Sequence, residues 1–130
     1  YISNPHIIDE KKYDLRIYVL VTSFSPLTIY IYEDGLVRFA TVKYSLDPEA
    51  FDNKFIHLTN YSINKKNEEY IQNKQKAEDS TSSSKWSLKT LEKVFLHTGK
   101  DWEKVKEGIH DVIIKELITV EPPIMEGYDK

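Results

Sequence analysis

Residues 13–22 read Tyr-Asp-Leu-Arg-Ile-Tyr-Val-Leu-Val-Thr, and this stretch decides the expected fold. Its density of β-branched and aromatic side chains is typical of a β-strand. Residues 23–26 interrupt the pattern, and residues 27–33 and 36–41 repeat it on either side of an Asp-Gly pair at 34–35. Asp-Gly favours a hairpin turn. The sequence therefore predicts three short strands in an antiparallel meander.

The middle of the chain lacks this regularity. Asp47-Pro48-Glu49 can open one helical turn, because proline suits a first helical position. Residues 57–64 are polar with a few apolar anchors and predict an ordered polar loop. Residues 65–84 have almost no side chains to bury, so we expect a mobile loop there.

Two helices are expected at the end of the chain, and together with the meander they predict an α+β fold. Apolar residues recur there at helical spacing, first at Trp86, Leu88, Leu91 and Phe95, then at Trp102, Val105, Ile109, Ile113, Leu117 and Val120. Ser83 or Ser84 is available as N-cap of the first helix. The short link at 98–99 suggests that the helices pack together, and the prolines at 122–123 are expected to end the second helix.

Composition limits the class of protein. The chain has 130 residues, 40% hydrophobic and 30% charged, as expected for one compact globular domain or a piece of a larger one. No apolar run reaches the roughly 20 residues of a membrane helix, and no secretory leader is visible. The absence of cysteine excludes a disulfide scaffold, and the net charge of −3 excludes a strongly basic nucleic-acid binder. The first residue is Tyr1 rather than Met, which suggests a fragment of a longer protein.

A polar strand face is the first candidate site. Lys12, Asp14 and Arg16 occupy alternate positions and point to one face, opposite a core face formed by Tyr13, Leu15, Ile17, Val19 and Val21. Arg38 on the third predicted strand could join them. The face is either solvated surface or the seat of a polar ligand. Only two of the 18 basic residues are arginines, Arg16 and Arg38, which reflects either chance or a need for the planar guanidinium fork.

The segment His-Leu-Thr-Asn-Tyr-Ser, residues 57–62, is the second candidate site. Its hydrogen-bonding side chains either satisfy the loop's own backbone or are presented to phosphate oxygens or a hydrated cation. A lone histidine such as His57 more often orients a loop than ligates a metal. The sequence contains no glycine-rich phosphate loop, no Ser-His-Asp arrangement and no metal-ligand spacing.

Several long motifs resemble the tubulin tyrosine ligase-like family. They are Lys-Tyr-Asp-Leu-Arg-Ile-Tyr-Val-Leu-Val-Thr-Ser at 12–23, Tyr-Glu-Asp-Gly-Leu-Val-Arg-Phe-Ala-Thr at 32–41 and His-Leu-Thr-Asn-Tyr-Ser-Ile-Asn-Lys at 57–65. The opening Tyr-Ile-Ser-Asn-Pro, residues 84–88 and residues 111–115 fit as well. Within the family the sequence looks most like the tubulin polyglutamylases, and the resemblance implies that residues 1–130 are an incomplete central to C-terminal portion of an ATP-grasp domain.

The resemblance implies an activity. In such a ligase ATP phosphorylates a carboxylate, and an amine displaces phosphate from the acyl phosphate to form an amide. The carboxylate is then a glutamate side chain of a tubulin C-terminal tail and the amine is that of free glutamate, with Mg²⁺ as metal ion. The expected location is cytoplasmic, on microtubules, in a cilium or basal body, and no nucleic acid or membrane is expected as partner.

The resemblance also assigns roles to residues. The nucleotide-binding set is Tyr1, Ile2, Lys12, Asp14, Thr59 and Asn60, of which Asn60 could also contact the metal. The amino-acid-binding set is Arg38, Tyr61, Ser62 and Lys85. Arg16 and His57 are supporting residues, and no catalytic residue is assigned within the chain.

The chain also departs from the family pattern. The family's phosphate-binding lysines and acidic metal motif are expected outside residues 1–130, so we expect the chain alone to be inactive. Two alternatives remain: a ligase of the same family that adds glycine or tyrosine, and a non-catalytic module that binds acidic tubulin tails through Lys65, Lys66, Lys74, Lys76 and Lys85.

Overall fold

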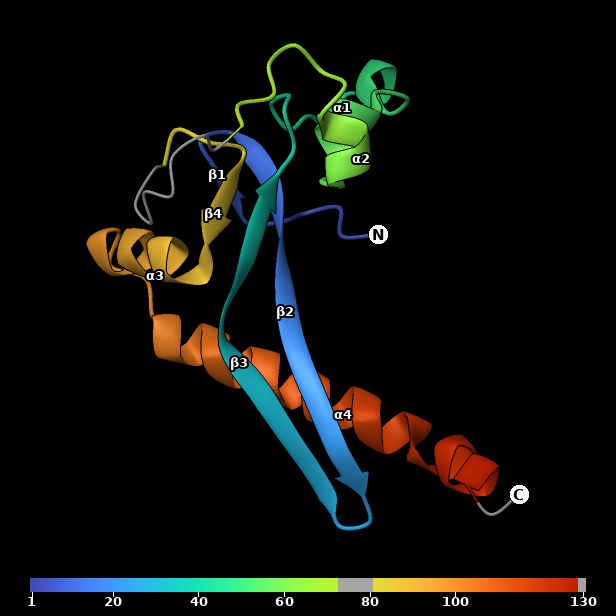
Figure 1. Ribbon diagram of the computed structural model, residues 1–130. Helices are drawn as coiled ribbons and strands as arrows, with labels where there is room; N and C mark the ends of the chain where they lie inside the picture. The colour runs from blue at the N-terminus through green and yellow to red at the C-terminus, as the bar shows by residue number, and fades with distance from the viewer. Residues whose placement is uncertain (73–80, 129–130) are drawn as a thin grey trace. The chain divides into compact units, whose positions relative to one another are not determined.

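The computed structural model describes residues 1–72 and 81–128. The chain divides into two compact units. Figure 1 labels the helices and strands of the described residues. The first unit comprises residues 1–18 and 33–91, and the second comprises residues 19–32 and 92–130. Every residue assigned to a candidate site by sequence lies in the first unit, so the site can be built from one compact body.

Four strands form the sheet in the order β1-β2-β3-β4. They are β1 (Ile7–Ile8), β2 (Lys11–Phe24), β3 (Leu27–Phe39) and β4 (Lys85–Ser87). The pairing of β1 with β2 and of β3 with β4 is antiparallel. Together with the helices this arrangement confirms the α+β prediction, although sequence patterns missed the two short outer strands.

The predicted hairpin turn at Asp34-Gly35 is wrong. The two residues lie inside β3, and the chain turns at Ser25-Pro26 instead, within the interruption that the sequence indicated. A Cβ added to Gly35 would lie 2.5 Å from the carbonyl oxygen of Arg16 and 3.0 Å from Cδ1 of Leu88. Glycine is present because neighbouring backbone passes close to this strand, not because the chain reverses direction.

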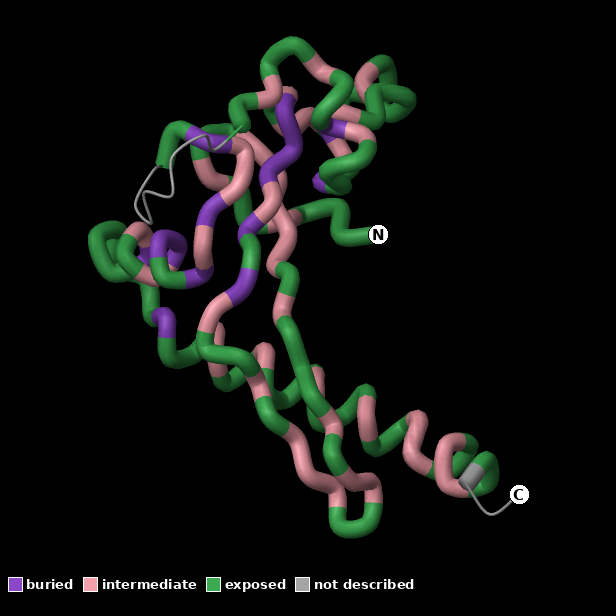
Figure 2. Tube along the Cα trace, viewed as in Figure 1, coloured by how far each residue is buried: buried purple, intermediate pink, exposed green. Residues whose placement is uncertain are grey.

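The core of the first unit lies on one face of its sheet. The ring of Phe39 is 5.5 Å from that of Tyr13 and 4.5 Å from that of Trp86. Val37 and Leu91 are almost completely buried, and Figure 2 shows buried residues concentrated along β3, β4 and the start of α3. Burying large apolar side chains is the main stabilising contribution here, and the opposite face is left for polar residues.

Short helices replace most of the predicted polar loop. The 3₁₀ turn Pro48–Ala50 confirms the helical turn predicted there, and the side chain of Asp47 caps it. Helices α1 (Lys54–His57) and α2 (Tyr61–Asn64) enclose the remaining loop residues 58–60. Four-residue helices are too short to produce a visible periodicity, which is why the sequence indicated only a loop.

Within the predicted mobile loop at 65–84, residues 73–80 lie outside the described residues, and with them Lys74 and Lys76 of the tail-binding alternative. The loop's two described ends are joined, because the amide of Ser84 donates to the carbonyl of Ile71 at 3.0 Å, and the amide of Ile71 donates to the hydroxyl of Ser84 at 3.1 Å. Mobility of residues 73–80 stays a prediction.

Helix α3 (Leu88–His97) begins later than predicted. Trp86 belongs to β4, and the side chain of Ser87 rather than Ser83 or Ser84 accepts a hydrogen bond from the amide of Thr90 at 3.0 Å. Strand and helix therefore meet at one serine. The helical spacing of Trp86 with Leu88 and Leu91 arose because both elements bury residues in the same core.

Helix α4 (Trp102–Tyr128) belongs to the second unit. The short link before it is confirmed: Gly99 has a φ of +68°, the left-handed conformation that glycine adopts freely after a helix. The rings of Phe95 and Trp102 lie 5.5 Å apart, which confirms that the two helices pack together. None of the helices in the described part of the chain combines the length and apolar character needed to cross a membrane.

The prediction that Pro122-Pro123 ends this helix is wrong. Both prolines lie inside α4. A proline has a helical φ but lacks an N–H donor, so the carbonyls of Ile118 and Thr119 lose their usual partners. Both residues are exposed and water can bond to these carbonyls, which lowers the cost of continuing the helix.

Candidate functional site

A row of charged side chains crosses three strands on the polar face of the sheet. Arg38 donates from Nε to Oδ1 of Asp14 at 2.9 Å and from Nη2 to Oδ2, so the two form a bidentate ion pair between β2 and β3. Lys85 on β4 lies directly opposite Arg38 in the strand register. The structure therefore confirms that Arg38 joins the face of Asp14, and it adds Lys85 to the same row.

Electrostatics differ along this row. The hydrogen bonds to Asp14 raise the pKa of Arg38 above its ordinary value, although partial burial acts in the opposite direction. Burial lowers the pKa of Lys85, and the positive charge of Arg38 lowers it further. One carboxylate thus faces two neighbouring cations, and the excess positive charge favours an anionic ligand beside Arg38 and Lys85.

Tyr61, the first residue of α2, stands next to the row. The ammonium of Lys85 lies 3.8 Å from the centre of its ring, and the ammonium of Lys65 lies 5.4 Å away. An aromatic face attracts a cation within about 6 Å. The ring therefore holds the Lys85 side chain in place, and the sequence-predicted residues Arg38, Lys85 and Tyr61 come together.

The N-terminal segment lies against the same strand face. The ammonium of Lys12 is 4.0 Å from the ring centre of Tyr1, and the hydroxyl of Tyr1 is 2.7 Å from Nδ1 of His57. The other ring nitrogen of His57 lies 3.2 Å from the carbonyl oxygen of Ala50. A carbonyl can only accept, so Nε2 carries the proton and Nδ1 accepts from Tyr1. His57 orients the loop, as a lone histidine was expected to do.

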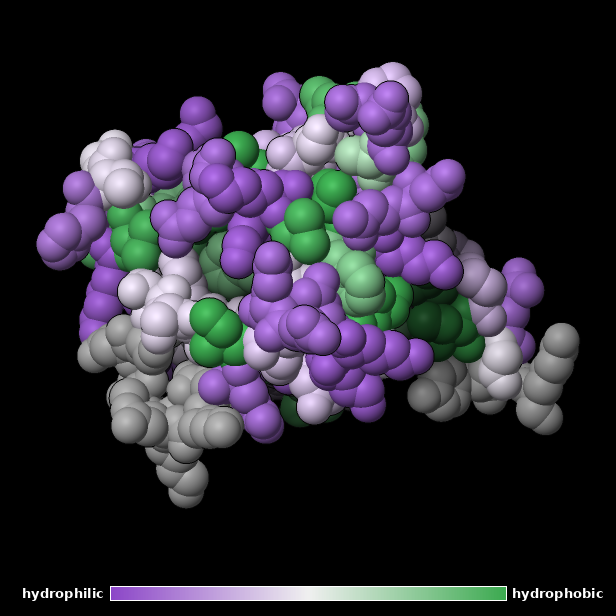
Figure 3. Space-filling model, turned by 90° about the horizontal axis from the view of Figure 1, so that it is seen from above, coloured by the Kyte–Doolittle hydropathy of each residue, from purple (hydrophilic) through white to green (hydrophobic). Residues whose placement is uncertain are grey.

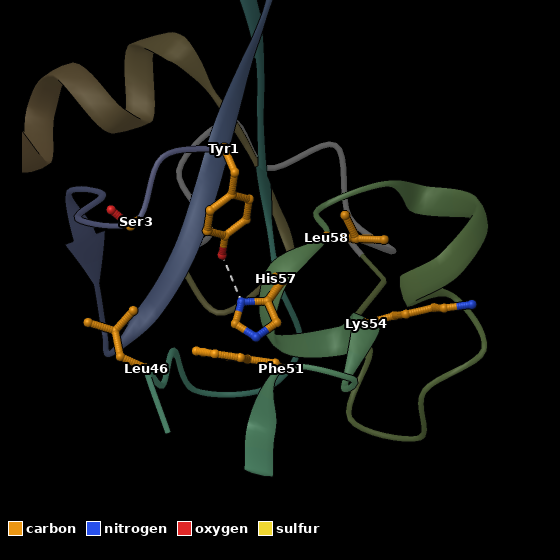
Figure 4. Close-up of a pocket in the computed structure, with 7 residues that line it drawn as sticks. All are labelled: Tyr1, Ser3, Leu46, Phe51, Lys54, His57 and Leu58. Atoms are coloured by element: carbon orange, nitrogen blue, oxygen red, sulfur yellow. Dashed lines mark hydrogen bonds between the residues drawn. The ribbon is translucent and has the colours of Figure 1, made fainter. Parts of the chain in front are cut away.

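A pocket of about 430 Å³ opens beside Tyr1 and His57 (Figure 4). Its lining is mostly apolar and consists of Tyr1, Ser3, Leu46, Phe51, Lys54, His57 and Leu58. The ring of Tyr1 points toward His57, and the ammonium of Lys54 points away from the pocket. A pocket of this size and lining suits a flat, largely apolar group.

Loop residues 59–62 differ in exposure. Thr59 is buried, whereas Asn60 and Ser62 are exposed, and the side chain of Asn60 makes no capping hydrogen bond to α2. Because they are exposed, Asn60 and Ser62 can offer their side chains to a ligand, while Thr59 is held within the fold.

Figure 3 shows hydrophilic side chains interleaved with smaller hydrophobic groups on the face seen from above.

Two predicted residues stand apart from this cluster. Ile2 is 66% exposed, in keeping with a role through its backbone only. Arg16 is exposed on β2, with its guanidinium carbon 5.7 Å from the ring centre of Tyr18. Neither residue adds a side-chain contact to the row formed by Asp14, Arg38 and Lys85.

Sequence reasoning missed Asn64. This residue is 1% exposed, and its side chain bonds to Thr41 and to the loop at 58–60. Asn64 was visible only as the end of a polar motif. A buried asparagine with partners far along the chain has no local signature, because the partners meet only in the folded protein.

The donor set fits a nucleotide better than it fits a metal ion. Asp14 offers carboxylate oxygens to hydroxyl groups, and Lys12 offers an ammonium to phosphate. Within residues 1–72 and 81–128, however, no group of three or more His, Asp or Glu side chains could hold a metal ion. Asn60 could supply one oxygen ligand to Mg²⁺, but the described residues do not form a magnesium site by themselves.

Fold and site together define an α+β domain with a row of charged side chains on one face of its sheet. A family model described as the tubulin-tyrosine ligase family matches residues 1–129, nearly the whole chain, so the chain belongs to this family. This finding confirms the resemblance seen in the sequence motifs.

The chain is also similar to individual members of this family. The chain is 48% identical over 122 residues to mouse tubulin monoglutamylase TTLL4, covering 94% of the chain and 10% of that relative. It is 44% identical to human tubulin polyglutamylase TTLL5, over 93% of the chain and 9% of the relative. It is 46% identical to Caenorhabditis elegans tubulin polyglutamylase ttll-4, over 97% of the chain and 20% of the relative. The chain thus spans about a tenth to a fifth of the length of these relatives.

Proposed function

We propose that the complete protein containing this chain is an ATP-dependent ligase that adds glutamate to glutamate side chains of tubulin C-terminal tails. The row of Asp14, Arg38 and Lys85, with Tyr61 beside it, is the observation that carries the proposal. It supplies a hydroxyl acceptor next to two cations on one strand face. The relatives named above are tubulin glutamylases, which favours glutamate as the added amino acid.

The nucleotide side of the site uses residues of β2 and the N-terminal segment. In the proposal the apolar pocket beside Tyr1 takes the adenine ring, with the backbone of Tyr1 and Ile2 at its edge. Asp14 accepts from the ribose hydroxyls through lone pairs that Arg38 leaves free, and Lys12 meets a phosphate. In this proposal the exposed side chain of Asn60 meets the phosphates and Mg²⁺, and the buried Thr59 contributes through its backbone.

The amino-acid side of the site uses Arg38, Lys85, Tyr61 and Ser62. A carboxylate is a planar group with two acceptor oxygens, and a guanidinium can meet both oxygens at once. Lys85, held over Tyr61, adds a second positive charge, and the exposed hydroxyl of Ser62 is available as a donor. Arg16 and His57 support the site, the latter by fixing the loop at 57–60.

The proposed chemistry follows from this arrangement. ATP supplies a phosphoryl group to the acceptor carboxylate of the tubulin tail, and the amine of glutamate displaces phosphate from the resulting acyl phosphate. This chain's residues hold the two partners close together and neutralise their charges, which lowers the barrier of such a transfer. In the proposal the main metal ligands lie outside residues 1–130. The complete protein acts on microtubules in the cytoplasm, including the microtubules of cilia and basal bodies.

The test uses the purified complete protein with ATP, Mg²⁺ and a tubulin-tail peptide. Glutamate, glycine and tyrosine are supplied in separate reactions, and mass spectrometry detects each added residue. We expect ATP-dependent addition of glutamate to a glutamate side chain. Addition of glycine or tyrosine instead of glutamate would show that the protein is a ligase for that amino acid. Binding of the peptide without any ATP turnover would favour a non-catalytic tail-binding module.

A further inference from the structure

The carboxamide of Asn64 is buried, and it forms hydrogen bonds with two separate segments of the chain. Its Oδ1 accepts from the amide of Thr41 at 3.0 Å and from the hydroxyl of Thr41 at 2.9 Å. Its Nδ2 donates to the carbonyl of Leu58 at 2.7 Å and to that of Asn60 at 3.1 Å. Two acceptor contacts and two donor contacts therefore depend on one side chain.

These partners belong to the two parts of the site. Thr41 follows β3 closely after Arg38, whereas Leu58 and Asn60 flank Thr59 in the loop that leads into Tyr61. Asn64 therefore ties the loop that presents Asn60 and Tyr61 to the strand that presents Arg38. The amide of Val42 also donates to the carbonyl of Phe55 at 3.2 Å, but this bond joins the end of β3 to α1 and not to residues 58–61.

We propose that Asn64 is a positioning residue that holds residues 58–61 against the end of β3, so that Asn60 and Tyr61 stand beside Arg38 and Lys85. The proposal rests on the proposed function, which gives Asn60 and Tyr61 their roles. Asn64 is 1% exposed and does not contact a ligand itself. It acts through the loop.

Only an asparagine side chain meets these requirements. An aspartate has the same shape, but its carboxylate has no donors and would face the carbonyl oxygens of Leu58 and Asn60. Burial and these oxygens would raise the pKa of that carboxyl group, so it would bind a proton as the pH falls and regain one donor. Leucine would remove all four side-chain hydrogen bonds, and among the described residues only the carbonyl of Asn60 would keep other donors, the backbone amides of residues 63 and 64.

Asn53 provides a matched control in the same unit. Its side chain accepts from the amide of Phe55 at 3.0 Å and caps α1, and it is exposed. Aspartate serves this role as well as asparagine does. Asn53→Asp and Asn64→Asp therefore make the same chemical change, one where only an acceptor is used and one where donors are needed.

The experiment measures steady-state ligation and hydrogen exchange in the complete protein. We expect Asn64→Asp to lower kcat and to raise KM for glutamate, with roughly a tenfold or larger loss in kcat/KM, because small displacements at a reacting centre are costly. KM for ATP should rise as well, because Leu58 lines the pocket assigned to adenine and Asn60 is assigned to the phosphates, but by less than KM for glutamate, since Lys12 and Asp14 do not depend on Asn64. Asn53→Asp should behave like wild type.

A role limited to folding would give a different result. Fewer folded molecules would lower the apparent kcat but leave both KM values unchanged. We also expect amide exchange to rise at residues 58–64 and not in β2, and the loss in Asn64→Asp to become smaller as the pH falls. Wild-type kinetics in Asn64→Asp, or exchange raised equally across the unit, would overturn the proposal.

A milder variant guards against misfolding. Thr41→Val removes only the hydroxyl bond to Asn64 and should shift kcat and KM for glutamate in the same direction, by less. If Asn64→Asp does not fold, a Thr41→Val protein whose kcat and KM for glutamate equal those of wild type would also overturn the proposal. If wild type adds no glutamate, the proposed function fails, while exchange at residues 58–64 still tests whether Asn64 holds the loop.

Discussion

The planar shape of the Arg38 guanidinium matters as much as its positive charge. The guanidinium meets both oxygens of Asp14, and Lys85 lies opposite Arg38 in the neighbouring strand. Lysine keeps the charge but acts as a point donor, so it cannot reproduce a bidentate contact. The residue is therefore the sharpest single test of the amino-acid site.

We expect Arg38→Lys to raise KM for glutamate by roughly tenfold, the loss of about one charge-assisted hydrogen bond. ATP affinity should change much less, because Lys12 and the pocket beside Tyr1 are intact. The measurement is glutamate-dependent ligation at saturating ATP and tubulin, with ATP affinity of the same variant as the internal control. Equal glutamate dependence in variant and wild type would remove Arg38 from the site.

Asp14 is proposed as the acceptor of the ribose hydroxyls, next to the proposed amino-acid site at Arg38. We expect Asp14→Ala to weaken nucleotide binding by roughly 1–3 kcal/mol, the usual cost of leaving charge-assisted partners unmade. Calorimetric titration with a non-hydrolysable ATP analogue measures it. Asp111→Ala is the control, because this carboxylate forms only an exposed ion pair with Lys115 in α4. Unchanged nucleotide affinity in Asp14→Ala would make this strand face plain solvated surface.

At the scale of elements, β3 depends on a glycine in its interior. Gly35 lies against the backbone of Arg16 and the side chain of Leu88, and Asp34 accepts hydrogen bonds from the amides of Gly35 and Leu88 at 2.7 and 2.9 Å. The Asp-Gly pair thus joins β2, β3 and the start of α3. The strand face that carries Arg38 depends on this junction.

We expect Gly35→Ala to destabilise the first unit by roughly 1–3 kcal/mol, the usual cost of overpacking. The new Cβ would meet backbone that cannot easily move. Gly108→Ala in α4 is the matched control: no atom lies within 4 Å of the added Cβ there, and alanine favours a helix, so stability should rise by about 0.5–1 kcal/mol. Native-state hydrogen exchange in β3 and α4 measures both, and equal effects at the two positions would contradict this explanation.

At the scale of the whole molecule, the described residues contain no group of three or more His, Asp or Glu side chains that could hold a metal ion. We therefore expect residues 1–130 alone to form no amide from ATP, glutamate and a tubulin-tail peptide. The complete protein, assayed in parallel, is the positive control. Glutamate addition by the isolated chain would show that the metal ligands lie within it after all.

The alternation of Lys12 with Asp14 was enough to place both on one strand face, and the spacing from Trp102 to Val120 was enough to place a helix. These patterns are local: a side chain's direction in a strand or helix follows from backbone geometry. Motifs around the candidate residues also indicated the family, which the match over residues 1–129 confirms. Fold class, the long strand, the second helix and the strand face that Asp14 shares with Arg38 were predictable for this reason.

Other features required the folded chain. The same Asp-Gly pair can turn a hairpin or pass through a crowded strand, and only the proximity of Arg16 and Leu88 selects the second. Pro122-Pro123 remain in α4, where the residues whose carbonyls lose donors, Ile118 and Thr119, are exposed, and this exposure depends on the helix's surroundings. The place of Asn64 is decided by Thr41, 23 residues away. The sequence by itself determined which residue types were available and how their side chains alternate. The tertiary structure decided which of them meet, because burial and hydrogen bonding between distant residues exist only once the chain has folded.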